Sequence, residues 1–361
     1  MFIQFVFVFS LLFAFSAATN STTKGGAAKK YIFDSELPDR LQWIDNDGYC
    51  GEVSCVMALL KSGAYLSQYD VREISAVSST DVQKSRFYLV GENDQHASEL
   101  LKLGYIEYDH DVFDSKVYLS WVKQMVRKGY SVTITVYMNN WLFYGMTDPD
   151  AGFPDYDHIV SVKDVQSDYD DDQYHDDDII TMSDHGLWAP EVPGPPYPYP
   201  FDAPYYFSYT FKEFQMTRQD ANKKTSGVYA LPISSPSKNY AGNFGIAHTG
   251  PADTEGSLQK ISITTNVNYE SPQIAKRSEV RPTPMEITLV VTVSALEAGT
   301  SYNLYKYKDE TSVPTSNFNA HKDQASSTMI IVGVKDTPFV LTEKIMSNQK
   351  VYYRCVKTTA N

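Results

Sequence analysis

The chain is poor in cysteine and in positive charge, and each shortage excludes a class of protein. Its 361 residues include three cysteines, Cys50, Cys55 and Cys355, too few for a small fold built on disulfide bonds. A bridge between Cys55 and Cys355 would tie the two ends of the chain together and leave Cys50 free. The 31 Lys and Arg are outnumbered by 44 Asp and Glu, for a net charge of −13, which argues against nucleic acid as a partner.

Long apolar runs are also missing after the first residues. Residues 1–18, MFIQFVFVFSLLFAFSAA, are uncharged, too short for a membrane span, and end in small residues that suit cleavage. We therefore expect a signal peptide, with a retained anchor as the alternative, and a mature chain that is secreted or lies in the lumen of the secretory pathway. No later stretch approaches about 18 consecutive apolar residues, so no membrane contact is expected after cleavage.

Motifs for nucleotides, zinc and activated serine are absent as well. The sequence has no Gly-rich phosphate loop, no H-E-x-x-H helix and no G-x-S-x-G elbow, so neither a cofactor nor a bound metal is expected. A run of aspartates between positions 168 and 178, with His175 among them, offers oxygen ligands for Ca²⁺, but its spacing does not fit an EF-hand. We interpret this run as a solvated hairpin tip.

The chain has the composition of a folded protein, with 42% hydrophobic and 14% aromatic residues. Apolar residues at helical spacing predict a helix from Cys50 to Leu60, ended by Gly63. A capping-box-like pattern of Ser67 with Asp70 predicts the start of a second helix. Two further helices are expected at 97–103 and 117–128. Strands rich in β-branched residues follow at 131–138, 158–165, 179–183 and 227–233, which makes the fold class α+β.

The rest of the chain is expected to contain a loop, a linker and a second domain. Prolines in the Tyr-rich stretch 195–211 disfavour regular structure, so we expect a packed irregular loop there. Ser, Gly, Asn and Pro mark 236–257 as a linker between a domain spanning 31–235 and a β-sandwich spanning 258–361. Six short strands predict this all-β sandwich: LQKISITTNV, MEITLVVTVSAL, SYNLYKYK, STMIIVGV, PFVLTEKI and KVYYRCVK.

Candidate chemistry begins at Cys50. A helix N-terminus and a neighbouring imidazolium both lower the pKa of a thiol and make it a better nucleophile. Cys50 opens a predicted helix after the turn Asn46-Asp47-Gly48. Gly51 is expected to leave the backbone open for a substrate carbonyl near the amide of Cys50. The alternative interpretation is a buried, inert cysteine.

His158 and Asp184 are the expected partners of Cys50. His158 begins a predicted strand, which should place its side chain at a sheet edge, a position that suits a general base. Asp184 ends the next strand, and in an antiparallel hairpin the start of one strand lies opposite the end of the other. The carboxylate should therefore lie beside the imidazole and orient it. His185 and Asp157 are the competing base and carboxylate.

These elements resemble the papain-like cysteine peptidases, in particular the bacteriocin-processing, double-glycine group. The resemblance covers about residues 40–190 and rests on Cys50-Gly51 heading a helix, the helix after Ser67, the strand from His158 and the strand ending in Asp184. It implies a papain-like domain before the sandwich. It also implies that Cys50 is the nucleophile, His158 the base and Asp184 the orienting acid, acting on a peptide or protein substrate. The negative charge of the chain would favour a cationic one.

One position departs from the family pattern. The family usually places an oxyanion-stabilising Gln six residues before the nucleophile, and Ile44 stands there in this chain. Asn46 is our expected replacement, with Gln42 as the alternative. The leading function is a secreted thiol hydrolase that cleaves peptide or amide bonds through an acyl-enzyme. A transglutaminase-like acyltransferase would use the same residues, and the missing Gln favours a third reading, an inactive extracellular binding or adhesion protein.

Overall fold

The computed structural model describes residues 28–42, 49–78, 87–112, 114–138, 156, 158–184, 205–215, 229–230, 243–270 and 283–358. The expected signal peptide and the residues Asn46, Asp157 and His185 lie outside these ranges. Within them, no helix combines the length and apolar character needed to cross a membrane. The described chain mixes helices with mainly antiparallel sheets, as expected for an α+β protein.

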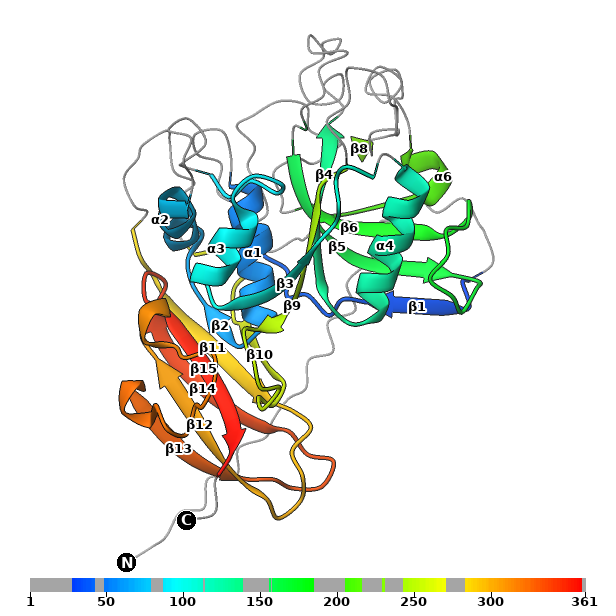
Figure 1. Ribbon diagram of the computed structural model, residues 1–361. Coiled ribbons are helices and arrows are strands. Elements are labelled where there is room, and N and C mark those ends of the chain that lie inside the picture. Colours follow the sequence, from blue (N-terminus) through cyan, green and yellow to red (C-terminus); the bar gives the residue numbers. More distant parts are fainter. Residues whose placement is uncertain are drawn as a thin grey trace, which may run out of the picture.

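The largest sheet is antiparallel and forms the centre of the N-terminal region (Figure 1). β1 (Tyr31–Asp34) pairs with β5, and β8 (Tyr229–Ala230) pairs with β4. The remaining strands lie in the order β3 (Leu103–Glu107), β9 (Gly245–Pro251), β4 (Ser131–Met138), β5 (His158–Ser167), β6 (Ile179–Asp184) and β7 (Tyr205–Thr210).

Helices cover both faces of this sheet (Figure 1). Successive side chains of β5 point to opposite faces and pack against different helices. Ile159 belongs to the core that includes α1 (Cys50–Lys61) and α3 (Asp94–Leu100). Val160 and Val162 point the other way, into the core shared with α4 (Ser115–Arg127). Two further helices are α2 (Gln68–Ser78) and the short α6 (Phe211–Phe214).

Side-chain caps and glycines fix the helix ends. The Ser67 hydroxyl donates to Asp70 at 2.6 Å and accepts the Asp70 N–H at 3.1 Å, which confirms the predicted start of α2. Asp114 caps α4 by accepting the N–H of Lys116 at 2.9 Å. Gly63 after α1 and Gly129 after α4 have φ of +73° and +76°, the conformation that ends many helices.

Three expectations need correction. The linker expected at 236–257 contains β9, which lies between β3 and β4 inside the sheet. Its short, Gly-flanked sequence carries little strand signal, and its pairing comes from distant partners. The loop expected at 195–211 ends in β7, because the prolines stop at Pro204. The helix expected at 97–103 is α3, which begins earlier, and its last expected residue starts β3.

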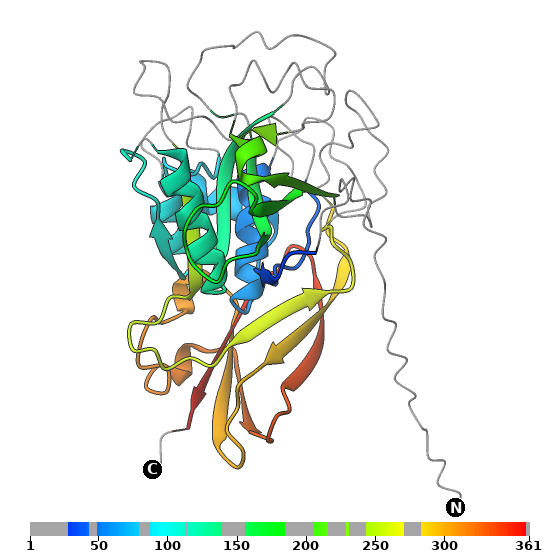
Figure 2. The same ribbon diagram turned by 90° about the vertical axis from the view of Figure 1, so that its right-hand side faces the viewer.

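Two smaller sheets form the C-terminal region and share one core (Figure 2). One contains β10 (Ile261–Thr265), β11 (Glu286–Val293) and β14 (Phe339–Met346). The other contains β13 (Ser327–Val332), β12 (Ser301–Tyr307), β15 (Val351–Lys357) and β2 (Ala64–Tyr65). All six strands expected after residue 258 are present, and β2 is an unexpected addition from the N-terminal region.

The N-terminal and C-terminal regions are joined by more than the chain. β2 pairs with β15, and residues of α1 share the buried core of the two smaller sheets. Arg354 of β15 is 1% exposed and donates to the carbonyl oxygens of Ser62 and Lys102 at 3.3 and 3.4 Å. Arg40 forms a buried ion pair with Glu270 at 3.2 Å. The folding of the two regions is therefore expected to be coupled.

Candidate thiol site at the start of the first long helix

Cys50 is the first residue of α1 and is partly buried. Tyr49 precedes the helix and makes no capping hydrogen bond through its side chain. Burial and then the charge of Glu52 raise the pKa of the Cys50 thiol to about 12. The nearby backbone N–H groups of Ile159 and Gly51 act in the opposite direction and lower the pKa. Cys50 thus lies against the start of β5, next to the residue that follows His158.

A largely buried ion pair between Glu52 and Arg72 begins two residues after the thiol. Arg72 of α2 donates its Nε to Glu52 at 2.8 Å, and the guanidinium lies 3.4 Å from the centre of the Tyr49 ring. The same carboxylate of Glu52 accepts the backbone N–H of Tyr88 at 3.0 Å. These contacts lock the first turn of α1 against α2 and the segment at Tyr88. The sequence reasoning assigned no role to Glu52 or to Arg72 in the chemistry.

Gly51 is needed for a reason different from the expected one. A Cβ on Gly51 would meet the backbone oxygen of Tyr88 at 2.0 Å. The space beside Gly51 is therefore occupied by the chain itself and is not an opening for a substrate carbonyl. Gly51 allows two backbones to pack closely, a role that depends on a residue 37 positions away in the sequence.

His158 begins β5 but does not lie at a sheet edge. β5 lies between β4 and β6, and His158 pairs with Val136. The side chain is 1% exposed, and burial lowers the pKa of its imidazole to about 3. The expected edge position is wrong because β5 is an inner strand with β4 on one side and β6 on the other, and His158 itself pairs with β4.

Asp184 ends β6 at the same end of the sheet. Ser161 of β5 pairs with Ser183 of β6, and Asp184 pairs with Tyr205 of β7. Continuing the β5–β6 register by one residue places Asp184 across from Val160, two residues from His158. The backbone therefore brings the ends of both strands together. The alternation of side chains along β5 places His158 on the same face as Val160, opposite the face that packs against α1. The expected oxyanion residue Asn46 lies outside the described residues.

Two buried amide side chains of the described residues, Gln42 and Asn243, have no hydrogen-bond partner. Gln42 is 6% exposed and Asn243 is fully buried, and the side-chain N and O of each have no hydrogen bond within the described ranges. Buried polar groups in this state are rare and mark strained or functional positions. Asn243 directly precedes Phe244, whose carbonyl accepts from Thr135 of β4, so it lies toward the end of the sheet where β5 begins. No sequence motif pointed to Asn243.

A second histidine lies in the core behind α1. His248 of β9 is 2% exposed, and its Nε2 lies 3.0 Å from the Ser98 hydroxyl and 3.3 Å from the Tyr88 hydroxyl. Burial lowers the pKa of His248 to about 4. Nearby, burial and then the charge of Glu107 raise the pKa of Asp94 to about 7. This set links α3, β9 and the Tyr88 segment through the core.

The acidic hairpin between β5 and β6 is neutralised by basic side chains. Lys123 of α4, fully buried, contacts Asp178 at 2.9 Å and Asp171 at 3.4 Å. Around the hairpin surface, Lys29 pairs with Asp168 and Asp177, Arg127 with Asp170 and Asp172, and Lys212 with Asp176. The expected solvated tip therefore has one buried aspartate, Asp178. Among the described residues, no group of three or more metal-ligating side chains is placed to hold an ion.

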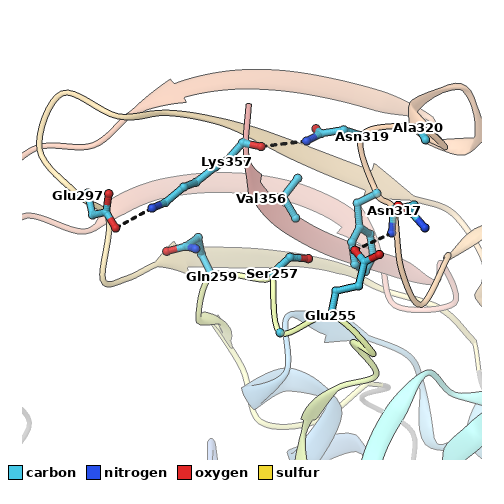
Figure 3. Close-up of a pocket in the computed structure, with 11 residues that line it drawn as sticks. Glu255, Ser257, Gln259, Glu297, Asn317, Asn319, Ala320, Val356 and Lys357 are labelled. Atoms are coloured by element: carbon cyan, nitrogen blue, oxygen red, sulfur yellow. Dashed lines mark hydrogen bonds and ion pairs between the residues drawn. The ribbon is translucent and has the colours of Figure 1, made fainter. Parts of the chain in front are cut away.

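A separate cavity of about 750 Å³ lies on the C-terminal region (Figure 3). Glu297 and Lys357 form an ion pair at 2.7 Å on one side of it, and Glu255 accepts the Asn317 N–H at 3.0 Å on the other. Val356 contributes apolar surface between them. Neither Cys50 nor His158 lines this cavity, so it is distinct from the thiol site.

Comparisons with known proteins give no further guide: no family model, no curated protein and no solved structure matches the chain.

Proposed function

We propose that the protein is a secreted, papain-like thiol hydrolase that cleaves peptide or amide bonds, with Cys50 as nucleophile and His158 as base. One observation carries the proposal: Cys50 begins α1, and its thiol lies close to the backbone N–H of Ile159, the residue after His158. Asp184, which ends the neighbouring strand β6, is the proposed orienting acid. The side chain of His158 shares the α4 face of β5 with Val160 and Val162, so a triad would require the imidazole to reach Cys50 around the end of the sheet.

The pKa directions define how the reaction would start. Because burial raises the pKa of Cys50 and lowers that of His158, both groups are neutral at pH 7. The thiol proton would pass to the imidazole as sulfur bonds to the substrate carbonyl carbon. The imidazolium would then protonate the leaving amine, and water would release the acid from the acyl-enzyme. The backbone N–H of Cys50 is the proposed oxyanion donor.

Gln42, the alternative to Asn46, is our proposed oxyanion side chain. Its amide is buried with neither polar atom hydrogen-bonded within the described ranges, the state of a donor that awaits a ligand. Replacing Gln42 by Glu keeps the size of the side chain and removes the amide donor. We expect kcat to fall by about 100-fold with little change in KM, and an unchanged kcat would assign the role elsewhere.

The test is reaction of the folded protein with iodoacetamide, followed by peptide mapping. Cys50 should be labelled, and Cys55, fully buried in the core, should be labelled only after unfolding. Cys50→Ala should abolish hydrolysis of a cationic peptide library, while Cys55→Ala should lower stability and retain turnover. Turnover by the Cys50→Ala variant contradicts the proposal. An amine adduct formed at the expense of the acid product would instead identify an acyltransferase.

The same pKa directions favour a second candidate, a non-catalytic extracellular binding protein. A buried thiol with a raised pKa and a buried imidazole with a lowered pKa do not form a stable thiolate–imidazolium pair. The pH dependence of alkylation separates the two candidates. A catalytic Cys50 should react with iodoacetamide faster near pH 7 than an exposed cysteine in a model peptide, whereas an inert Cys50 should react more slowly at every pH below about 10.

A further inference from the structure

β13 is an open and unusually apolar edge of the C-terminal region. It pairs with β12 on one side, and no described strand pairs with it on the other. Ile330 is 69% exposed, Val332 is 56% exposed and Val334 is 59% exposed. Four of the eleven exposed large apolar side chains in the described ranges lie between positions 329 and 334. Concentrated apolar exposure of this kind marks an interaction surface.

Alternate residues of β13 direct their backbone N–H and C=O groups toward β12 and toward the open side. The N–H of Gly333 donates to the carbonyl of Thr300 at 2.9 Å, which fixes the odd-numbered residues of β13 as those that bond to β12. The N–H and C=O groups of Thr328, Ile330 and Val332 therefore point to the open side. The edge thus offers both backbone groups and apolar side chains to an incoming strand.

The edge strand of the opposite sheet provides an internal contrast. β14 also pairs on one side only, with β11. It carries Glu343, held by Lys306 and Tyr353, and Lys344, which is 68% exposed and pairs with Glu286 at 2.7 Å. Charged residues on an edge strand oppose pairing with another chain. From position 325 to 334, β13 and its flanks contain no charged residue, so β13 lacks this protection.

We propose that β13 pairs antiparallel with β13 of a second copy of this chain, across a two-fold axis at Ile330. In this register Ile330 faces Ile330 of the copy, and Thr328 faces Val332, so each open backbone group meets its complement. Because positions 325 to 334 carry no charge, two copies of this edge meet without like-charge repulsion between the paired strands, although the net charge of −13 opposes the association as a whole. The two four-stranded sheets would become one sheet of eight strands. This surface is separate from the thiol site, and the inference does not depend on the proposed function.

The experiment measures the mass of the full secreted chain by sedimentation equilibrium over a range of concentrations. The parent protein should show a reversible monomer–dimer equilibrium. Ile330→Lys places two like charges opposite each other at the axis and should raise the dimer Kd by at least about tenfold. Val340→Lys is the matched control, since Val340 is 52% exposed on β14, and it should leave the Kd unchanged.

A disulfide test checks the register. Ile330→Cys should give a covalent dimer on mild oxidation, because directly opposed residues bring their Cα atoms to about 5.5 Å. Val340→Cys should remain monomeric under the same conditions. The proposal is overturned if the parent protein is monomeric at all concentrations. It is equally overturned if such a monomer uses β13 to bind a strand of another protein. A dimer that survives Ile330→Lys, or that both lysine variants disrupt equally, also overturns it.

Discussion

Lys123 offers the sharpest test of how the N-terminal sheet is stabilised. Its ammonium group is fully buried and lies 2.9 Å from Asp178, 3.1 Å from the Ser167 hydroxyl and 3.1 Å from the carbonyl of Gln173. Asp178 is also fully buried. Lys123→Met keeps much of the side-chain volume but leaves the Asp178 carboxylate without its cation. Breaking one side of a buried pair typically costs about 3–5 kcal/mol, so we expect a loss of that size in the free energy of unfolding.

A control in the same hairpin isolates the effect of burial. Lys212 pairs with Asp176 at 3.3 Å, but the two side chains are 73% and 55% exposed. Lys212→Met should therefore change the free energy of unfolding by less than about 1 kcal/mol. Urea unfolding followed by far-UV circular dichroism measures both variants. The double variant Lys123→Met/Asp178→Leu should recover part of the loss, because no charge is then left buried.

The result that would refute this reasoning is a Lys123→Met variant within about 1 kcal/mol of the parent protein. Such a result would mean that the pair is solvated or dispensable, and that the acidic hairpin is held mainly by its surface ion pairs. Equal losses for Lys123→Met and Lys212→Met would lead to the same conclusion.

Three further predictions concern pH, close packing and the contact between the regions. The pKa of Asp94 is raised to about 7 in the folded protein, above its unfolded value near 3.9, so its contribution to stability is present at low pH and is lost as the pH rises from about 4 through about 7. The urea midpoint of Asp94→Asn should equal that of the parent near pH 4 and exceed it at pH 8. If the urea midpoints of the two proteins change equally with pH, the prediction is contradicted. Gly51→Ala should cost at least about 2 kcal/mol in urea unfolding, because its Cβ would meet the Tyr88 oxygen at 2.0 Å; a neutral effect would disprove the close approach. Arg354→Met should cost about 2–4 kcal/mol by removing donors from buried carbonyls, whereas Lys357→Met, exposed and paired with Glu297, should cost less than about 1 kcal/mol.

Local sequence patterns were sufficient for much of the secondary structure. The Ser67–Asp70 pair, the glycines at 63 and 129, and the β-branched runs after residue 258 each carry their signal within a few residues. The corresponding helix ends and strands agree with the structure. The exceptions were β1, β2, β3, β7 and β9, whose short sequences form strands only because distant strands pair with them.

The sequence by itself determined that Cys50 opens a helix, that His158 opens a strand and that Asp184 ends the next one. Only the tertiary structure decided their surroundings. β9 enters the sheet from the expected linker, and β5 lies between β4 and β6 with a buried histidine where an edge position was expected. The Tyr88 carbonyl fills the space beside Gly51, and burial sets the pKa directions of Cys50 and His158. Burial and long-range pairing depend on contacts between residues far apart in the chain, which no local pattern records.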